Sequence, residues 1–288
     1  MLTAADVVRR AGSLATIPTV YLRLVNASGD PRRSMTEVGR IIEEDAAISA
    51  RLLRLANSAL FRRGEHVEDV PRALRSVGIA AALDLALATS VISAFAVRLP
   101  SVITPREFWL HAVACGVAAR AVATRAGLSG ERHFTAGVLH DVGRLLLLLV
   151  EPETMKRAMA EAARERVPLR DAETAVLGFD HAALGAELLR TWGLPETLVV
   201  AAGGHHAPGS ATAHADIAAA IHIADALVHA LALGASGEMM IPRVEPEAWS
   251  LLGLTSPDLE PLVGEIERQF ADVVQVLLLY EEAESPRG

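Results

Sequence analysis

The 288-residue sequence contains one cysteine, few aromatic residues and an excess of negative charge, and each shortage excludes a class of protein. Because Cys115 is the only cysteine, no intrachain disulfide can form, which fits a reducing compartment. The formal net charge of −8 argues against a nucleic-acid-binding surface and against a polybasic membrane anchor. The N-terminus has no signal-peptide pattern, and no uninterrupted apolar run approaches the roughly 18 residues that span a bilayer. We therefore expect a cytoplasmic protein that binds neither nucleic acid nor membrane.

The shortage of aromatic residues also shapes the expected core. Aromatic residues make up only 4% of the sequence, whereas hydrophobic residues make up 51%, so the core must be aliphatic. Alanine and leucine dominate and β-branched runs are few, which favours helix over strand. Apolar residues recur at helical spacing in nearly every segment. The clearest helix start is Thr104-Pro-Arg-Glu107, a capping box with proline at the first helical position. The sequence predicts an all-α, multi-helix bundle.

Weak breaks in the helical pattern divide the chain into three expected parts. These are an N-terminal helical part at 1–100, a helical core at 101–235 and a C-terminal helical extension at 236–288. The last long helix carries a broad apolar stripe, which we expect to pack onto its own bundle. A homodimer interface is the alternative. The stripe consists of Leu262, Ile266, Phe270, Val273, Val274 and Leu277.

The stretch GVLHDVGR, residues 137–144, places an imidazole beside a carboxylate in an otherwise apolar run. A bare carboxylate is expensive to bury, so the pair must either be neutralised by structural partners or hold a metal ion. We expect one helix, opened by Ser129, to carry the whole stretch. Gly137 and Gly143 would then allow another helix to approach closely.

Further histidines and carboxylates fall within or at the ends of the central helices, and a shared cation would satisfy several of them together. Since there is no second cysteine, we expect nitrogen and oxygen ligands for iron, manganese or zinc, and no thiolate site. His222 and His229 are better interpreted as ordinary core histidines, and Asp180 as the N-cap of the next helix. The candidate metal ligands are His111, His140, Asp141, His181, His205, His206 and Asp225.

Several motifs resemble one family. The LHDxG stretch, a Trp-x-His motif at 109–111 and the later Ala224-Asp225 are similar to the HD superfamily of metal-dependent phosphohydrolases. The run LLRLANS at 52–58 more specifically resembles the HDOD domain, the HD-related output domain of bacterial signalling. The segments 178–185 and 192–195 match later motifs of that family in order. The resemblance covers about residues 14–235.

The resemblance implies a set of ligands and two departures from the catalytic relatives. It implies that His111, His140, Asp141 and Asp225 bind one metal ion. In the HD-GYP branch, which hydrolyses cyclic di-GMP, two further histidines complete a multinuclear site. Their counterparts in this sequence are His181 and one or both of His205 and His206. Where that branch has lysine, this chain has Arg144, which can still clamp a phosphate, and the Gly-Tyr-Pro segment is missing.

These features lead to three functional hypotheses. The first is a stand-alone HDOD regulatory protein that acts through a signalling partner or a cyclic nucleotide. It would not be catalytic, and any bound metal ion would have a structural role. The second is a metal-dependent phosphohydrolase that acts on cyclic dinucleotides. The third is an all-α scaffold whose polar cluster is a metal-free hydrogen-bond network.

Overall fold

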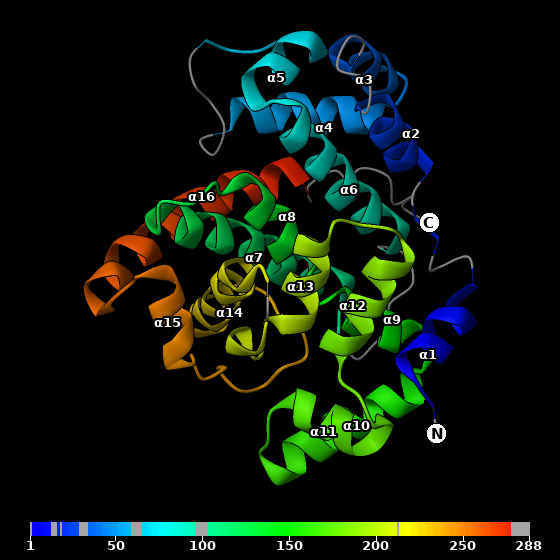
Figure 1. Ribbon diagram of the computed structural model, residues 1–288, viewed down its shortest axis with the longest axis vertical. Coiled ribbons are helices and arrows are strands. Elements are labelled where there is room, and N and C mark those ends of the chain that lie inside the picture. Colours follow the sequence, from blue (N-terminus) through cyan, green and yellow to red (C-terminus); the bar gives the residue numbers. More distant parts are fainter. Residues whose placement is uncertain are drawn as a thin grey trace, which may run out of the picture. The chain divides into compact units, whose positions relative to one another are not determined.

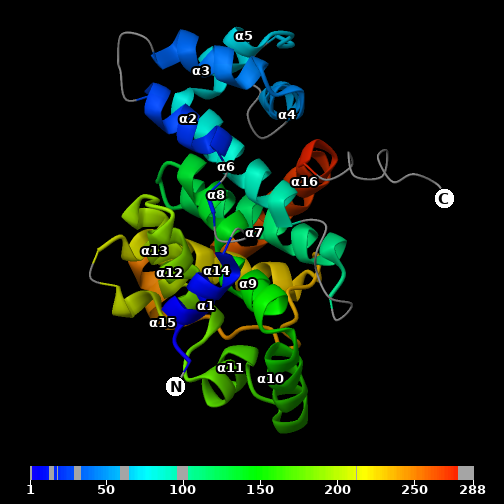
Figure 2. The ribbon, with the colours of Figure 1, turned by 90° about the vertical axis from the view of Figure 1, so that its right-hand side faces the viewer.

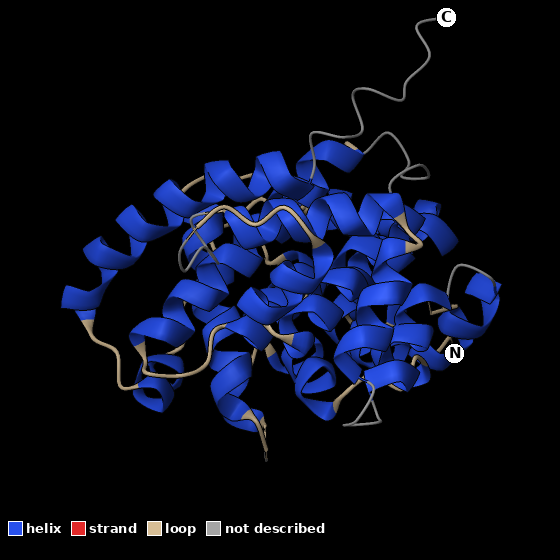
Figure 3. Cartoon of the chain, turned by 90° about the horizontal axis from the view of Figure 1, so that it is seen from above, coloured by secondary structure: helices blue, strands red, loops and turns tan. Residues whose placement is uncertain are grey.

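Every regular element in the described part of the computed structural model is a helix, which confirms the predicted all-α class (Figure 3). The structure describes residues 2–12, 16–17, 19–28, 34–58, 65–95, 103–211 and 213–277. By its contacts the chain forms two compact units. One unit comprises Met1–Thr16 and Phe95–Ile266, and the other comprises Ile17–Ala94 and Glu267–Gly288. The three-part division at 100 and 235 stays a prediction.

The smaller unit contains the helices of the LLRLANS half. Its helices are α2 (Thr19–Ser28), α3 (Ser34–Glu43), α4 (Ala46–Asn57), α5 (Val70–Val77), α6 (Ile79–Phe95) and the end of α16 (Leu259–Leu277). Helix α3 packs on α2, α4 and α5. The LLRLANS run lies on α4, where Leu52 and Leu55 are buried. Asn57 ends that helix and exchanges two hydrogen bonds of 2.8 Å with the backbone of Val67, which holds the following segment against α4.

The larger unit contains every candidate metal ligand. Helix α7 packs on α8 and α14, and α12 packs on α9 and α13 (Figure 1). The N-terminal helix α1 lies on α9 and α12 (Figure 2). The helices of this unit are α1 (Ala4–Ala11), α7 (Pro105–Arg125), α8 (Glu131–Leu139), α9 (Val142–Val150), α10 (Pro152–Glu165), α11 (Leu169–Leu177), α12 (His181–Thr191), α13 (Glu196–Gly204), α14 (Ala215–Ala230), α15 (Pro246–Leu252) and the start of α16.

The prediction of one continuous helix through GVLHDVGR is wrong. Helix α8 ends at Leu139 and α9 begins at Val142, so His140 and Asp141 form the turn between two helices. Asp141 leaves helical geometry, with φ −96° and ψ 14°. The pair therefore lies at a helix junction, where an imidazole and a carboxylate can be aimed at one point more freely than from adjacent positions of a regular helix.

The two glycines that flank the pair permit close approach, as expected. A Cβ at Gly137 would lie 2.5 Å from the carbonyl oxygen of Cys115 on α7. A Cβ at Gly143 would lie 2.1 Å from the carbonyl oxygen of His181 on α12. Both clashes are with backbone, which cannot rotate away, so only glycine lets α8 and α9 approach these two neighbours so closely. The spacing of the candidate ligands depends on this contact.

The stretch Arg132–Val150, which runs from α8 through the turn into α9, is long and apolar enough to cross a membrane by length and composition alone, although polar residues interrupt it. Helix α5 and residues Ile79–Ile92 of α6, which are bent by 108° relative to one another, are long and apolar enough for a membrane span only if the two are counted as one span. In Arg132–Val150, 89% of the span is buried inside the protein, as in a core helix. A cytoplasmic location stays a prediction.

The C-terminal stripe begins inside the larger unit. Leu262 and Ile266 are fully buried there, as expected for packing onto its own bundle. The side chain of Leu277, the last residue of the stripe, lies outside the described part of the chain. A homodimer stays a prediction.

Candidate metal centre

The candidate ligands come from five helices and meet in the interior of the larger unit. His111 lies on α7, the His140–Asp141 pair at the α8–α9 junction, and Asp225 on α14. His181 is the first residue of α12, while His205 and His206 follow the end of α13. All seven residues are at most 5% exposed except His206, which is half-buried. The structure therefore brings the candidate ligands together in the interior, and their binding of a metal stays a prediction.

The donor atoms of this cluster form three overlapping groups, in each of which all atoms lie within 4.8 Å of one another. The first group contains His111, Cys115, His140 and Asp225. In it, Asp225 Oδ1 lies 3.3 Å from His111 Nε2 and 3.7 Å from His140 Nε2.

The other two groups extend the cluster toward α12 and α13. One contains His140, Asp141 and His205, and the other contains His181, His205 and His206. Asp141 Oδ1 lies 3.1 Å from His181 Nε2, and His206 Nε2 lies 2.9 Å from the same nitrogen. Because His140 and His205 each belong to two groups, the cluster offers adjacent positions for more than one ion.

Two of the buried imidazoles have the orientation of metal ligands. His140 places Nδ1 2.7 Å from the carbonyl oxygen of Gly137, and His205 places Nδ1 2.7 Å from that of Ala202. A carbonyl oxygen only accepts, so each Nδ1 is the protonated donor and each Nε2 carries a lone pair. Neither Nε2 has a hydrogen-bond partner among the described residues. Metal-binding histidines are oriented by their second nitrogen in this way, so the donor set fits a cation.

The charges of the cluster also favour a cation. Burial raises the pKa of Asp225, but the neighbouring imidazoles of His111, His140 and His229 together outweigh burial and hold that pKa well below its ordinary value. Burial also raises the pKa of Asp141, but the charges of Arg144, His140 and His181 together outweigh burial and hold that pKa well below its usual range. The buried site therefore holds ionised carboxylates in excess of its one guanidinium.

In the metal-free protein, protons make up the missing positive charge. Burial and the nearby Arg144 both lower the pKa of His181, yet the carboxylates of Glu173 and Asp141 raise it to about 9. A divalent ion would replace such protons, because a metal binds the deprotonated ligand. The third hypothesis, a metal-free network, would leave the imidazole of His181 protonated in the core.

Arg144, the expected phosphate clamp, is buried among protein groups. Its Nη1 donates to Asp141 Oδ2 and to Ser236 Oγ, each at 2.8 Å. Its Nη2 lies 3.0 Å from His181 Nε2. The side chain is 2% exposed, so it positions Asp141 in this structure. Its action on a phosphate stays a prediction.

Glu173 is a member of the site that the sequence analysis missed. Its Oε2 accepts from the backbone nitrogen of His181 at 2.8 Å and lies 2.6 Å from Nδ1 of the same residue. Its Oε1 lies 3.6 Å from Arg144 Nε. A signal was present: Glu173 occupies the buried face of α11 between Leu169 and Leu177, where a carboxylate needs a partner.

The ordinary interpretations of three other residues agree with the structure. Asp180 caps α12 by accepting from the backbone nitrogen of Ala183 at 2.8 Å. His222 is satisfied by the carbonyl oxygen of His205 at 2.6 Å and by the backbone nitrogen of Glu245 at 2.9 Å. His229 lies 3.0 Å from Asp225 Oδ1 and supports that carboxylate.

A chain segment covers the cluster. Residues 234–245, which we call the strap, run from α14 to α15 without regular structure. Arg144, His206 and Asp225 line a cavity of about 150 Å³ together with strap residues that include Glu238 and Ile241. The cavity gives the cluster a narrow approach beneath the strap.

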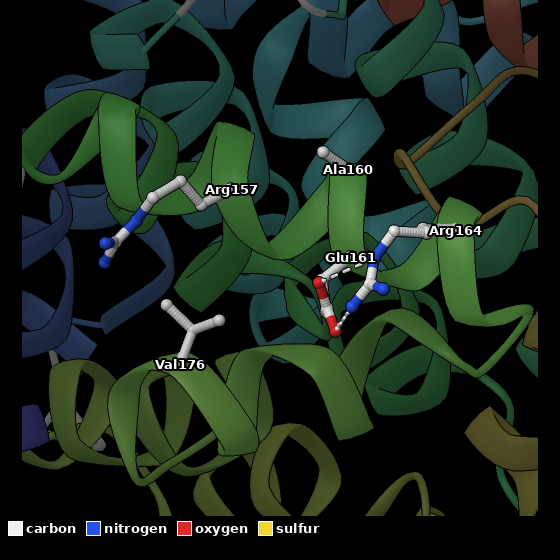
Figure 4. A pocket seen from close by; sticks show the side chains of 5 residues that line it. All are labelled: Arg157, Ala160, Glu161, Arg164 and Val176. Carbon is white, nitrogen blue, oxygen red and sulfur yellow. Dashed lines mark hydrogen bonds and ion pairs between the residues drawn. The ribbon is translucent and has the colours of Figure 1, made fainter.

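Two larger hollows have little of this chemistry. The groove in Figure 4 measures about 500 Å³ and lies between α10 and α11, with an exposed Glu161–Arg164 ion pair at its edge. It is lined by Arg157, Ala160, Glu161, Arg164 and Val176, none of which belongs to the cluster. Another open groove of about 520 Å³ touches the cluster only at His206. We therefore base the functional argument on the buried cluster and the strap.

Comparison with known families agrees with the fold. A model of the HDOD domain matches residues 14–208, which is more than half of the chain. The chain belongs to the HDOD family. A curated relative, an uncharacterised protein of Treponema pallidum (strain Nichols), is 24% identical over 205 residues. That match covers 70% of this HDOD chain but only 39% of the relative, so the chain spans well under half of its length.

Solved structures share the HDOD architecture. An HDOD domain protein of unknown function from Geobacter sulfurreducens is 22% identical, with a TM-score of 0.79 over 96% of this chain and 98% of that one. A proposed phosphohydrolase from Shewanella amazonensis SB2B is 22% identical, with a TM-score of 0.73 over 94% and 97%. A proposed signal transduction protein from Marinobacter aquaeolei VT8 is 19% identical, with a TM-score of 0.68 over 91% and 58%. At these identities the likeness shows the fold alone.

Proposed function

We propose that this HDOD protein is a regulatory module that acts through a signalling partner or a cyclic nucleotide, without catalysis. In this proposal the buried cluster holds a divalent metal ion that stabilises one conformation of the module. The observation that carries the proposal is that the strap covers the cluster. The cavity between them has a volume of about 150 Å³, whereas pockets for small-molecule ligands usually have volumes of roughly 300–1,000 Å³. A cyclic dinucleotide does not fit against the cluster while the strap is in this position.

The strap connects the cluster to the protein surface. Ser236 Oγ accepts from Arg144 Nη1 at 2.8 Å, and the same nitrogen donates to Asp141. At the far end, the backbone nitrogen of Glu245 donates to His222 Nε2 at 2.9 Å. Any change in the charge of Asp141 alters its attraction for Arg144, and the hydrogen bond to Ser236 passes that change to the strap.

The near end of the strap is fixed to the helix that carries His111. The backbone nitrogen of Ala235 donates to the carbonyl oxygen of Glu107 at 3.0 Å. Gly234 has φ +80°, and a Cβ there would lie 2.3 Å from the backbone nitrogen of His111. This end is therefore a close backbone contact that only glycine allows.

The middle of the strap offers apolar side chains to a partner. Met239 is 79% exposed and Ile241 is 63% exposed, while Met240 between them is 42% exposed. Methionine-rich surfaces adapt to different partners because the side chain is flexible and polarizable. The proposal is that metal or ligand binding in the cluster changes the order of the strap, and that a signalling partner detects the strap.

Hydrogen exchange of the full chain with and without metal tests this proposal. We expect the amides of 234–245 to exchange at least about tenfold more slowly after zinc, manganese or iron(II) is added, because binding closes local opening by linkage. The variant Ser236→Ala should lose this protection while still binding metal, because it removes the hydroxyl that contacts Arg144 and His229 but no candidate ligand. The exposed Ser256→Ala, at the start of the turn before α16, is the matched control. Exchange of the strap that metal leaves unchanged would contradict the proposed coupling.

A metal-dependent phosphohydrolase is the second candidate, and a specific observation favours it. The three overlapping donor groups could hold more than one ion, and His205 Nε2 has no hydrogen-bond partner among the described residues. Bound ions would lower the pKa of a water molecule and polarise a phosphoryl oxygen. In the chain itself, Arg144 holds Asp141 in place and Glu173 holds His181.

Assays of the metal-loaded protein with cyclic dinucleotides separate the two candidates. The regulatory proposal predicts turnover far below about 1 s⁻¹ for each metal tested. Turnover at or above that rate, abolished by His140→Ala, would establish the hydrolase and refute the regulatory proposal.

A further inference from the structure

The single cysteine lies inside the candidate metal centre. Cys115 is one helical turn after His111 on α7, and its side chain is fully buried. Its Sγ lies 3.5 Å from His111 Nε2 and 3.9 Å from Asp225 Oδ1. It also lies within 4.8 Å of His140 Nε2. The expectation of a site without sulfur did not allow for this position, since a lone cysteine in the sequence gives no sign of its neighbours.

Three of the distances among these four atoms match those between ligands around one ion. An ion with ligands at about 2.0 to 2.3 Å in a tetrahedron separates neighbouring ligand atoms by roughly 3.3 to 3.8 Å. The distances from His111 Nε2 to Asp225 Oδ1 and to Cys115 Sγ are 3.3 and 3.5 Å, and that from His140 Nε2 to Asp225 Oδ1 is 3.7 Å. The distance from sulfur to Asp225, 3.9 Å, is slightly longer.

A second observation points to a ligand at this place. The Nε2 of His140 is fully buried, carries a lone pair and has no hydrogen-bond partner among the described residues. A buried polar atom without a partner is unfavourable, and a bound ion would satisfy it. Asp141 Oδ2 also lies near this nitrogen, at 3.5 Å, and it accepts from Arg144 at 2.8 Å. Beside these oxygen and nitrogen donors, the thiol of Cys115 is the sulfur donor of the group.

We propose that Cys115 Sγ is a ligand of the metal ion held by His111, His140 and Asp225, and that it makes the site prefer iron(II), cobalt or zinc over manganese. The inference rests on the proposed metal in the cluster and adds a ligand to it. On binding, the S–H bond breaks, the proton passes to solvent and a metal–sulfur bond forms, without any oxidation or reduction. Thiolate ligands favour the softer ions of the first transition row, whereas carboxylate and water suit manganese. The sulfur therefore decides which ion the centre takes.

Cobalt(II) substitution of the full chain tests the proposal. We expect the wild-type protein to show a near-ultraviolet sulfur-to-cobalt charge-transfer band and, by X-ray absorption, a sulfur neighbour at about 2.3 Å. No other cysteine exists to produce the band. In Cys115→Ser both signals should disappear, and the ratio of zinc to manganese affinity should fall by at least about tenfold, the usual effect of disturbing a ligand shell. The variant retains all six methionines, so a sulfur signal that survives in it would overturn the assignment.

The wild-type spectra decide the proposal even if the variant fails to fold. Bound cobalt with nitrogen and oxygen neighbours only would overturn the sulfur ligand and leave the proposed metal centre in place. No bound cobalt in the folded wild-type protein would overturn both. A purely structural thiol would alter stability on substitution without changing the cobalt spectrum, which distinguishes that role from ligation.

Discussion

The substitution Gly143→Ala tests the helix contact on which the cluster depends. The new Cβ would lie 2.1 Å from the carbonyl oxygen of His181 and 2.4 Å from the backbone nitrogen of Gly185. Both neighbours are backbone atoms of α12, so α9 and α12 must separate by about 1 Å to reach ordinary contact. Overpacking of this kind usually lowers the free energy of unfolding by about 1–3 kcal/mol, whereas the higher helix propensity of alanine over glycine raises it by about 1 kcal/mol. With two backbone clashes we expect a net loss of about 2 kcal/mol.

Thermal unfolding followed by circular dichroism measures this loss, which corresponds to a melting temperature lower by about 4–8 °C. Gly185→Ala, on the other side of the same contact, is the matched control. A Cβ there would meet its nearest atoms at 3.4 and 3.6 Å, which are ordinary contact distances, so we expect a melting temperature equal to or above that of the wild type. Equal stability of the two variants would refute the close contact of α9 with α12.

Three further predictions follow from other contacts. Glu173→Ala leaves the backbone nitrogen and Nδ1 of buried His181 without their acceptor and removes one carboxylate beside Arg144, so it should destabilise by about 3–5 kcal/mol in chemical denaturation. The surface variant Glu187→Ala should lose less than about 1 kcal/mol, and equal losses would contradict the assigned burial. Adding zinc, manganese or iron(II) at 100 times the dissociation constant should stabilise the wild type by about 2.7 kcal/mol. His140→Ala should abolish that shift, whereas the exposed His66→Ala should retain it; a shift that persists in both would place the ion elsewhere. Thr104→Ala removes the hydroxyl that accepts from the backbone nitrogen of Glu107 and should lower stability by about 1 kcal/mol, and an unchanged midpoint would show that the cap is dispensable.

Local signals made much of the fold predictable. The cap residues Thr104 and Asp180 start helices where the sequence places them, because capping depends on residues only three positions apart. The aliphatic composition predicted helices, and the family motifs predicted which residues would meet. Gly137 and Gly143 indicated close packing, because glycine disfavours a helix and is expected there only where a side chain would not fit.

The parts of the site that could not be predicted from the sequence depend on contacts formed in three dimensions. The helix breaks at His140 and Asp141, although the apolar periodicity around them is typical of one continuous helix. The hydrogen bond from Arg144 to Asp141 at this break can be recognised only in the structure. Glu173 meets His181 across the turn between α11 and α12. Ser236 reaches Arg144 from a loop 92 residues later in the chain. None of these pairings has a fixed spacing from which a sequence pattern could be recognised.

The central claim is that the buried cluster holds a metal ion, and crystallographic anomalous scattering combined with metal analysis of the purified protein tests it most directly. The account predicts at least one transition metal per chain and an anomalous peak between His111, His140 and Asp225, both absent from Asp225→Ala. Trace metal after both aerobic and anaerobic purification, with no anomalous peak in crystals soaked with zinc, manganese or iron(II), would contradict it. The cluster would then be the metal-free hydrogen-bond network of the third hypothesis.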